Sequence, residues 1–313
     1  FEGERALTAN ALVASLRRAL RGPDAQMAAS LLASLKENSI EVADTDKWLG
    51  SRPISTDAPL YADHELVQLS PSSAESFEQC GLKWLLERNG GSAGDSSLAL
   101  LGSVIHEYAR LRVQDSEITD QELQKKLEES WPLITDSVGW ISKAELKRAS
   151  DMLKRFAQYH RESSMKIHGV ELRFEYTLGR ARVMGTVDRL QVTSDGKYYV
   201  VDFKTGEASG FKEAQANLQL ACYQLAVVLD GFVEKLDNTL DGGSHLVYLG
   251  HDTTEIAIRP RDPLKVEEVT EQISAIVAKM ALPTFTAKEN EYCGTCPVRT
   301  SCPLRLEGRT VIS

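Results

Sequence analysis

Two segments decide the fold, Gly185-Thr186-Val187-Asp188-Arg189-Leu190 and Val200-Val201-Asp202-Phe203-Lys204-Thr205-Gly206. They belong to runs rich in valine, tyrosine and phenylalanine, residues 181–193 and 197–204, a composition typical of β-strands. Ser194-Asp195-Gly196 lies between the runs and consists of residues that favour turns. The sequence therefore predicts an antiparallel hairpin with one aspartate on each strand.

The two aspartates are predicted to face each other across this hairpin. If the turn is a three-residue loop, Thr193 faces Lys197. Counting outward by equal steps then places Asp188 opposite Asp202, about 5 Å away at Cβ. Like charges in that position destabilise a sheet. A divalent cation bound between the two carboxylates would explain why two acids face each other there. Lys204 follows Asp202 by two residues and projects from the same face, where its ammonium suits negative charge on a phosphate.

Two alternatives apply to this hairpin. A two-residue turn at Asp195-Gly196 would shift the register and put the acids one step out of line. In the simplest interpretation the acids and the lysine form an exposed salt bridge, which is what most isolated matches to so short a pattern mean. Asp202, however, follows the apolar Tyr199-Val200-Val201 in mid-strand, where an unpaired charge requires a reason.

Three residues on predicted helices extend the candidate site. Gln219 and Tyr223 are four residues apart, so they share a helix face and can reach one point. His106 lies in the largely apolar stretch 101–108. Each also has a purely structural interpretation, in which Tyr223 is a core aromatic, Gln219 a surface residue and His106 a hydrogen-bonded core histidine.

Three of the five cysteines crowd near the end of the chain. Cys293, Cys296 and Cys302 lie within ten residues. Without a secretory signal, such a cluster indicates a metal site rather than disulfides. Cys80 is the candidate for a fourth ligand, which would clip the tail onto an early helix, and Cys222 is better explained by packing in an apolar helix. Structural zinc is the alternative for this cluster, although a second local Cys-x2-Cys pair is absent.

The rest of the chain predicts a small mixed sheet flanked by helices. Helices are expected at 7–36 (two), 70–88, 98–113, 120–130, 142–162, 212–229 and 264–281, and further strands at 170–177, 245–250 and 254–259. Ser70-Pro71 is a helix start. Residues 50–62 hold two prolines among small and polar residues and are a plausible linker. We therefore expect residues 1–67 to be a helical segment and linker from a preceding region, and residues 68–313 to be the main domain.

Composition limits the possible functions. The chain has 313 residues, with 36 Lys and Arg against 45 Asp and Glu, a net charge of −9. This argues against a free-standing protein that coats DNA, but not against a nucleic-acid enzyme, whose metal site needs acidic residues. The longest apolar stretch, 218–229, is too short to cross a membrane, and no secretory signal opens the chain, so we expect a cytoplasmic protein. Because the first residue is Phe1, we expect a piece of a longer polypeptide.

Taken in order along the chain, these residues resemble the RecB-type PD-(D/E)XK nucleases that carry an iron–sulfur staple. The resemblance covers roughly residues 68–305 and rests on Cys80, His106, Asp188, Asp202-x-Lys204, Gln219-x3-Tyr223 and Cys293-x2-Cys296-x5-Cys302. Ser70-Pro71-Ser72 and Trp84-Leu85-Leu86-Glu87-Arg88 are most similar to the nuclease domains of the AdnAB and AddAB helicase–nucleases. Each motif alone is weak, whereas their combination in this order is specific.

The resemblance implies a restriction-endonuclease-like α/β core and a role for each residue. His106, Asp188, Asp202 and the backbone carbonyl of Phe203 would hold one or two Mg²⁺ or Mn²⁺ ions. Lys204 would position or activate the attacking water, and Gln219 and Tyr223 would orient the scissile strand or the lysine. A structural [4Fe–4S] cluster would be bound by Cys80, Cys293, Cys296 and Cys302.

The implied function is a metal-dependent, exonuclease-type DNase domain that trims single strands emerging from a helicase in double-strand-break repair. Its partners would be DNA, a helicase region in the same polypeptide and a helicase–nuclease partner subunit, with no membrane. Two alternatives remain open: a non-catalytic domain that guides DNA or holds a subunit, and a zinc-stabilised interaction module. Intact Asp188, Asp202 and Lys204 favour catalysis over the first.

Overall fold

The computed structural model describes residues 8–48, 57–91, 97–250 and 255–305. The chain divides into two compact units, Phe1–Ala58 together with Pro303–Ser313, and Pro59–Cys302. The first unit contains helices α1 (Ala9–Ala19) and α2 (Ala25–Glu37) and two short 3-10 turns, Glu41–Ala43 and Thr45–Lys47. Its small core is built from Val13, Leu16, Ala28, Leu32 and Ala43. The two predicted N-terminal helices are therefore present.

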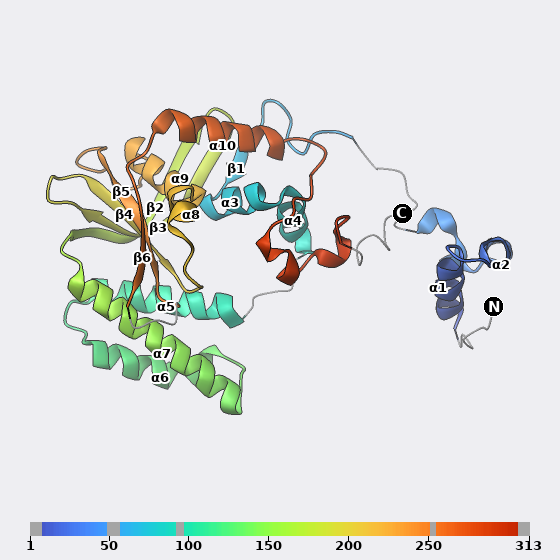
Figure 1. The fold of residues 1–313 in the computed structure, drawn as a ribbon, viewed down its shortest axis with the longest axis horizontal. Coiled ribbons are helices and arrows are strands. Elements are labelled where there is room, and N and C mark those ends of the chain that lie inside the picture. Colours follow the sequence, from blue (N-terminus) through green and yellow to red (C-terminus); the bar gives the residue numbers. More distant parts are fainter. Residues whose placement is uncertain (1–7, 49–56, 92–96, 251–254, 306–313) are drawn as a thin grey trace. The chain divides into compact units, whose positions relative to one another are not determined.

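The second unit, Pro59–Cys302, is built on a six-stranded mixed sheet (Figure 1). Its strands are β1 (Val67–Leu69), β2 (Lys166–Leu178), β3 (Ala181–Val192), β4 (Tyr198–Lys204), β5 (Asp241–Tyr248) and β6 (Ala257–Arg261). The order is β1-β3-β4-β5-β6, with β2 pairing β3. β1 is parallel to β3 and β4 to β5, and the other pairs are antiparallel. The predicted small mixed sheet flanked by helices is confirmed.

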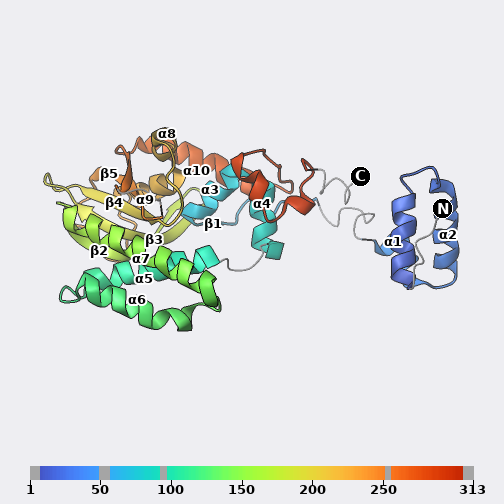
Figure 2. The ribbon, with the colours of Figure 1, turned by 60° about the horizontal axis from the view of Figure 1, so that its bottom comes forward.

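Helices cover both faces of this sheet (Figures 1 and 2). One face carries α3 (Pro71–Gln79), α8 (Phe211–Gln215), α9 (Leu218–Val228) and α10 (Val266–Met280), and the other carries α5 (Ser97–Gln114), α6 (Asp120–Ile134) and α7 (Gly139–Glu162). Short helical segments complete the unit: α4 (Gly81–Leu86), η3 (Glu87–Gly91), η4 (Glu291–Thr295) and η5 (Arg299–Ser301). None of the described helices is long and apolar enough to span a membrane.

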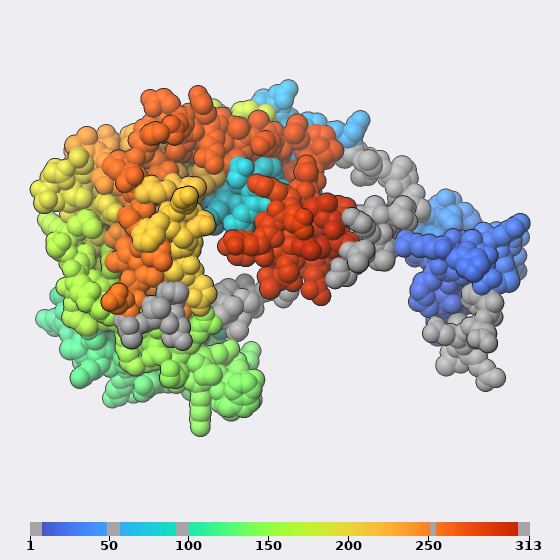
Figure 3. Space-filling model, in the orientation of Figure 1, coloured from blue at the N-terminus to red at the C-terminus, as the bar shows by residue number. Residues whose placement is uncertain are grey.

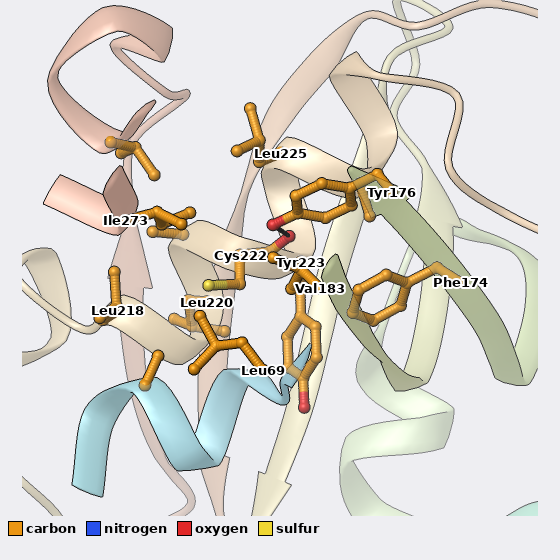
Figure 4. Packing of buried hydrophobic residues seen from close by; sticks show 14 of the residues in the cluster. Leu69, Phe174, Tyr176, Val183, Leu218, Leu220, Cys222, Tyr223, Leu225 and Ile273 are labelled. Carbon is orange, nitrogen blue, oxygen red and sulfur yellow. Dashed lines mark hydrogen bonds between the residues drawn. The ribbon is translucent and has the colours of Figure 1, made fainter. Parts of the chain in front are cut away.

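Two hydrophobic cores lie on the two faces of the sheet. The core under α9 is centred on residues such as Phe174, Tyr176, Leu220 and Tyr223 (Figure 4). Cys222 is fully buried in the same core, as the packing interpretation predicted, and burial raises its pKa to about 12. The second core joins α5, α6 and α7 to the opposite face of β4 and β5. The carboxyl end of β4 is thus packed from both sides.

Two predicted helices are each divided in the structure. The helix starting at Ser70 begins as expected, because the Ser70 side chain accepts a hydrogen bond from the Ser73 amide at 3.1 Å. It stops at Cys80, whose backbone is extended, and the Leu82 amide donates to Thr286 O at 3.2 Å instead of continuing the helix. The predicted helix 212–229 is interrupted at Asn217, which caps α9 through the Leu220 amide at 2.8 Å.

Strand boundaries also differ from the prediction. β1 has only three residues, too few to give an alternating pattern, and was not predicted. β5 begins four residues earlier than expected, at Asp241, and residue 254 of the last predicted strand lies outside the described residues. Pro260 lies within β6, which is tolerable because β6 ends the strand order of the sheet.

Candidate active site

The β3–β4 hairpin has the register that the three-residue loop predicts. The Thr193 amide donates to Lys197 O at 2.9 Å. The strand pairing then runs to Arg189 opposite Val201, where it ends. The prediction that the pairing continues to Asp188 opposite Asp202 is wrong, because the pairing stops one residue earlier. Instead, Asp188 Oδ2 accepts a hydrogen bond from the Phe203 amide at 2.7 Å. The strands therefore separate at Asp188, and its side chain takes the place of a backbone partner.

The strand end beside Asp188 is held by a buried arginine. Arg189 is 1% exposed, and its guanidinium lies 5.1–5.6 Å from the ring centres of Phe156, Tyr159 and Phe203. Such cation–π contacts gain strength when they are desolvated. Since Phe203 also donates its amide to Asp188, this packing fixes both partners of that hydrogen bond.

Asp202 is a buried carboxylate with one oxygen that accepts no hydrogen bond. The residue is 2% exposed, and Oδ1 accepts from Gln219 Nε2 at 3.1 Å. Oδ2 lies 2.9 Å from Lys204 Nζ, in an ion pair rather than a well-aligned hydrogen bond. Burial, and secondarily the charge of Asp188, raises the pKa of Asp202 to about 6, although Lys204 lowers it. The site thus holds a carboxylate oxygen with spare acceptor capacity.

A chain of polar contacts fixes the lysine. Lys204 Nζ donates to Gln219 Oε1 at 2.6 Å, and Gln219 Nε2 donates to Tyr223 Oη at 2.8 Å. Gln219 and Tyr223 lie one turn apart on α9, as the spacing predicted. Burial lowers the pKa of Lys204, but Asp202 outweighs it and the net shift is upward, so the amine is held as an ammonium.

The opposite side of Asp188 carries a second group of ligand-type atoms. His106 on α5 places Nδ1 3.4 Å from Asp188 Oδ1 and 4.0 Å from Glu171 Oε1. Ligand atoms of these three residues lie within 4.8 Å of one another.

Glu171 is the member of this group that the sequence analysis missed. Val170 pairs with Arg189 and Leu172 with Val187, so Glu171 lies opposite Asp188 on β2. Its backbone φ is 51°, in the left-handed region that a residue with a side chain rarely adopts. Strained backbone of this kind persists where surrounding structure imposes it and is concentrated at functional sites.

The electrostatics of this group suit a divalent cation. Burial raises the pKa of Glu171, and the nearby Asp188 charge raises it further. For His106, burial lowers the pKa, but the hydrogen bond and charge of Asp188 outweigh burial and raise it to about 9. Carboxylate oxygens with one imidazole, at a place where negative charge accumulates, are donors that Mg²⁺ or Mn²⁺ accepts. The residues therefore fit the implied metal, while the proposed role of the Phe203 carbonyl remains a prediction.

The C-terminal tail lies against the α3–α4 junction (Figures 1 and 2). Besides the Leu82–Thr286 bond, Lys288 Nζ donates to Glu78 O at 3.1 Å and Asn290 Nδ2 donates to Gln79 O at 3.2 Å. Phe285 stacks on Trp84, with ring centres 5.9 Å apart. The tail that carries three cysteines is thus attached next to Cys80.

The cysteine sulfurs do not form a single-ion site. Among the described residues, which include all four predicted ligands, no group of three or more sulfurs lies within 4.8 Å. Four thiolates around one zinc ion lie about 3.8 Å apart, as follows from Zn–S bonds of about 2.3 Å in a tetrahedron. Cys293 Sγ accepts a hydrogen bond from the Asn290 amide at 3.3 Å. A four-cysteine cluster remains a prediction.

The chain is similar to one family of proteins and to several solved structures. No curated protein matches the chain. Among solved structures, that of SSO0001 has 13% identity over 92% of this chain and 99% of its own, with a TM-score of 0.36. A protein from Eubacterium rectale named "Putative exonuclease" has 15% identity over 68% of this chain and 78% of its own, with a TM-score of 0.40. The model of the PD-(D/E)XK nuclease superfamily matches residues 68–303, most of the chain, which therefore belongs to that superfamily.

Proposed function

We propose that this domain is a metal-dependent deoxyribonuclease that hydrolyses phosphodiester bonds in single-stranded DNA, from an end. One observation carries the proposal: the Lys204 ammonium lies 2.9 Å from the buried Asp202 carboxylate, on the strand next to Asp188. This places an amine that can meet a phosphate beside Asp202, while Asp188 belongs to the group of ligand-type side chains with His106 and Glu171, which does not include Asp202. Membership of the nuclease superfamily supports the reaction class.

Each residue has a role in this mechanism. His106, Glu171, Asp188 and Asp202 would hold one or two Mg²⁺ or Mn²⁺ ions. A bound divalent ion neutralises phosphate charge and makes a nucleophile from water near neutral pH. Lys204 stabilises the charge that develops on the phosphate and orients the attacking water. Gln219, fixed by Tyr223, holds the Lys204 amine in place.

The cysteines are proposed to bind a structural [4Fe–4S] cluster. Cys80, Cys293, Cys296 and Cys302 have the spacing of the iron–sulfur staple of RecB-type nucleases. Three hydrogen bonds already attach the tail next to Cys80.

The proposed setting is a helicase–nuclease of the AdnAB or AddAB type, acting in double-strand-break repair in the cytoplasm. The support is the order of motifs from Cys80 to Cys302 together with the Ser70-Pro71-Ser72 helix start. In this setting residues 1–67 would come from a helicase region of the same polypeptide. The net charge of −9 disfavours tight binding of DNA by the isolated domain, so this setting requires DNA contacts from elsewhere in the complex.

The test is degradation of labelled single-stranded DNA with Mg²⁺, with Mn²⁺ and with EDTA. Wild type should shorten a linear strand only with the metal and should leave a circular strand intact. Asp202→Ala should abolish the activity, and Lys279→Ala, a lysine exposed on α10, should not change it. Equal activity of wild type and Asp202→Ala would leave a DNA-guiding or scaffolding domain as the better description.

A further inference from the structure

A large cavity opens beside the catalytic lysine. Its volume is about 910 Å³, near the upper end of the range of roughly 300–1,000 Å³ usual for ligand pockets. Its lining includes Lys204, the loop 206–210, the start of α9 and, from the tail, residues 288, 290, 291 and 292. Figure 3 shows the recess between the red tail and the yellow and orange part of the surface. The metal-binding acids are not among its lining residues.

The charge of this cavity does not suit a phosphate. Five glutamates line it, Glu75, Glu78, Glu207, Glu213 and Glu291, against two lysines, Lys204 and Lys288. Lys204 is the amine proposed to meet the scissile phosphate, and Lys288 already donates to Glu78 O. Nucleobases are neutral, and their amino groups donate to carboxylates. The lining therefore favours bases over backbone phosphates.

The tail contributes one aromatic residue to this lining. Tyr292 is 52% exposed and belongs to the lining. Its pKa is raised, first by partial burial and then by Glu291, Glu75 and Tyr248; the last two lie on α3 and β5, on other walls of the same cavity. Tyr292 is therefore a half-exposed aromatic residue in the lining of the cavity. Exposed aromatic rings are the platforms on which single-stranded nucleic acids stack their bases.

We infer that this cavity receives one or more bases of single-stranded DNA next to the scissile phosphate, and that Tyr292 stacks on one of them. The inference rests on the proposed nuclease function. Tyr292 directly precedes Cys293, so a metal cluster bound by Cys293 would also fix the position of the Tyr292 ring. The tail would then both carry the cluster and contact the substrate. The same tail that is fastened to the α3–α4 junction then forms a wall of the substrate site.

The experiment uses oligodeoxynucleotides with 2-aminopurine at successive positions, bound in Ca²⁺ to prevent cutting. Wild type should quench the fluorescence at one or two positions only. Tyr292→Ala should abolish that quenching and weaken binding by about tenfold. Tyr292→Phe, which keeps the ring, should behave as wild type. Trp140→Ala removes an aromatic residue that is 78% exposed but does not line the cavity, and should also behave as wild type.

The outcomes separate this inference from the proposed function. If wild type cuts DNA in an Asp202-dependent way while Tyr292→Ala keeps both the quenching and the KM, the nuclease stands and the base-binding cavity is wrong. If Tyr292→Ala and Trp140→Ala weaken binding equally, the effect is not specific to the cavity and the inference also fails. Position-specific quenching that needs Tyr292, in a protein without cleavage, would support the cavity and contradict the nuclease.

Discussion

The Lys204 ammonium lies 2.9 Å from Asp202 Oδ2 while donating to Gln219 Oε1 at 2.6 Å. The Lys204 amine therefore neutralises the charge of the Asp202 carboxylate, and its position is fixed by the neutral amide of Gln219. Replacing Lys204 by Met should lower kcat by roughly 10²-fold or more, because stabilisation of developing charge is lost. Affinity for Mn²⁺ should not fall, since a positive charge is removed from beside Asp202. Calorimetric Mn²⁺ titration and single-turnover cleavage measure the two effects, and a parallel loss of both would contradict this division of roles.

Tyr223 acts on the lysine through Gln219. Tyr223→Phe removes the hydroxyl that accepts from Gln219 Nε2 at 2.8 Å and should lower kcat by roughly tenfold without changing metal affinity. Tyr176→Phe is the matched control, because it removes a buried hydroxyl of the same core, bonded to Cys222 O at 3.2 Å (Figure 4). Both variants should lose about 1 kcal/mol of unfolding free energy. Similar kcat values for Tyr223→Phe and Tyr176→Phe would show that Tyr223 contributes to packing and does not position Lys204.

The parts of the candidate site that could be predicted from the sequence are those set by the register of a hairpin or by the spacing of residues on one helix. The three-residue loop Ser194-Asp195-Gly196 set the register of β3 and β4 through Thr193 and Lys197, and α-helical spacing joined Gln219 to Tyr223. The same counting across the β2–β3 turn, where Leu178 pairs with Ala181, places Glu171 opposite Asp188. A two-residue turn at Gly179-Arg180 is therefore the sequence signal that places Glu171 in the site.

Other features depend on contacts between distant parts of the chain. The helix break at Cys80 accompanies a hydrogen bond from Leu82 to Thr286, about which local sequence says nothing. The separation of the strands at Asp188 depends on its bond to the Phe203 amide, because a side chain has replaced a backbone partner there. Propensity and pattern describe neighbours in sequence, so neither feature could be predicted from them.

Glu171 is expected to contribute to metal binding. Glu171→Gln removes a carboxylate charge from the group that also contains His106 and Asp188, and should weaken Mn²⁺ binding by about tenfold or more. Glu175→Gln is the control on the same strand, because Glu175 forms an ion pair with Arg182 at 2.8 Å on the surface. Mn²⁺ titration followed by electron paramagnetic resonance measures both. Equal affinities would exclude Glu171 from the metal site.

Metal binding should release a proton from His106. In the metal-free protein its pKa is raised to about 9, mainly because Asp188 outweighs burial, so the imidazole is protonated at pH 7.5. A metal ligand must be neutral, so binding should release about one proton, and the apparent affinity should rise with pH up to about 9. In the absence of metal the raised pKa stabilises the fold fully below about pH 6.5, and this contribution is lost as the pH rises through about 9.

Calorimetry in buffers of different ionisation enthalpy measures this proton. The binding enthalpy of Mn²⁺ to wild type should depend on the buffer, whereas that of His106→Gln should depend on it much less. A buffer-independent enthalpy for wild type would mean that His106 either stays protonated or is no ligand.

Cys302 is expected to hold the tail through the cluster rather than to take part in the reaction. Anaerobically purified protein should be brown and contain about four iron atoms per chain if all four cysteines bind a [4Fe–4S] cluster. Cys302→Ala should lose most of the iron and lower the temperature of unfolding. Cys222→Ala, which truncates a cysteine buried in the core, should lose stability through a cavity yet keep its iron. A soluble, fully folded Cys302→Ala protein without iron would show that the contacts of the tail with α3 and α4 suffice to attach it. Colourless wild-type protein that contains zinc would show that the cysteines bind a single metal ion and not an iron–sulfur cluster.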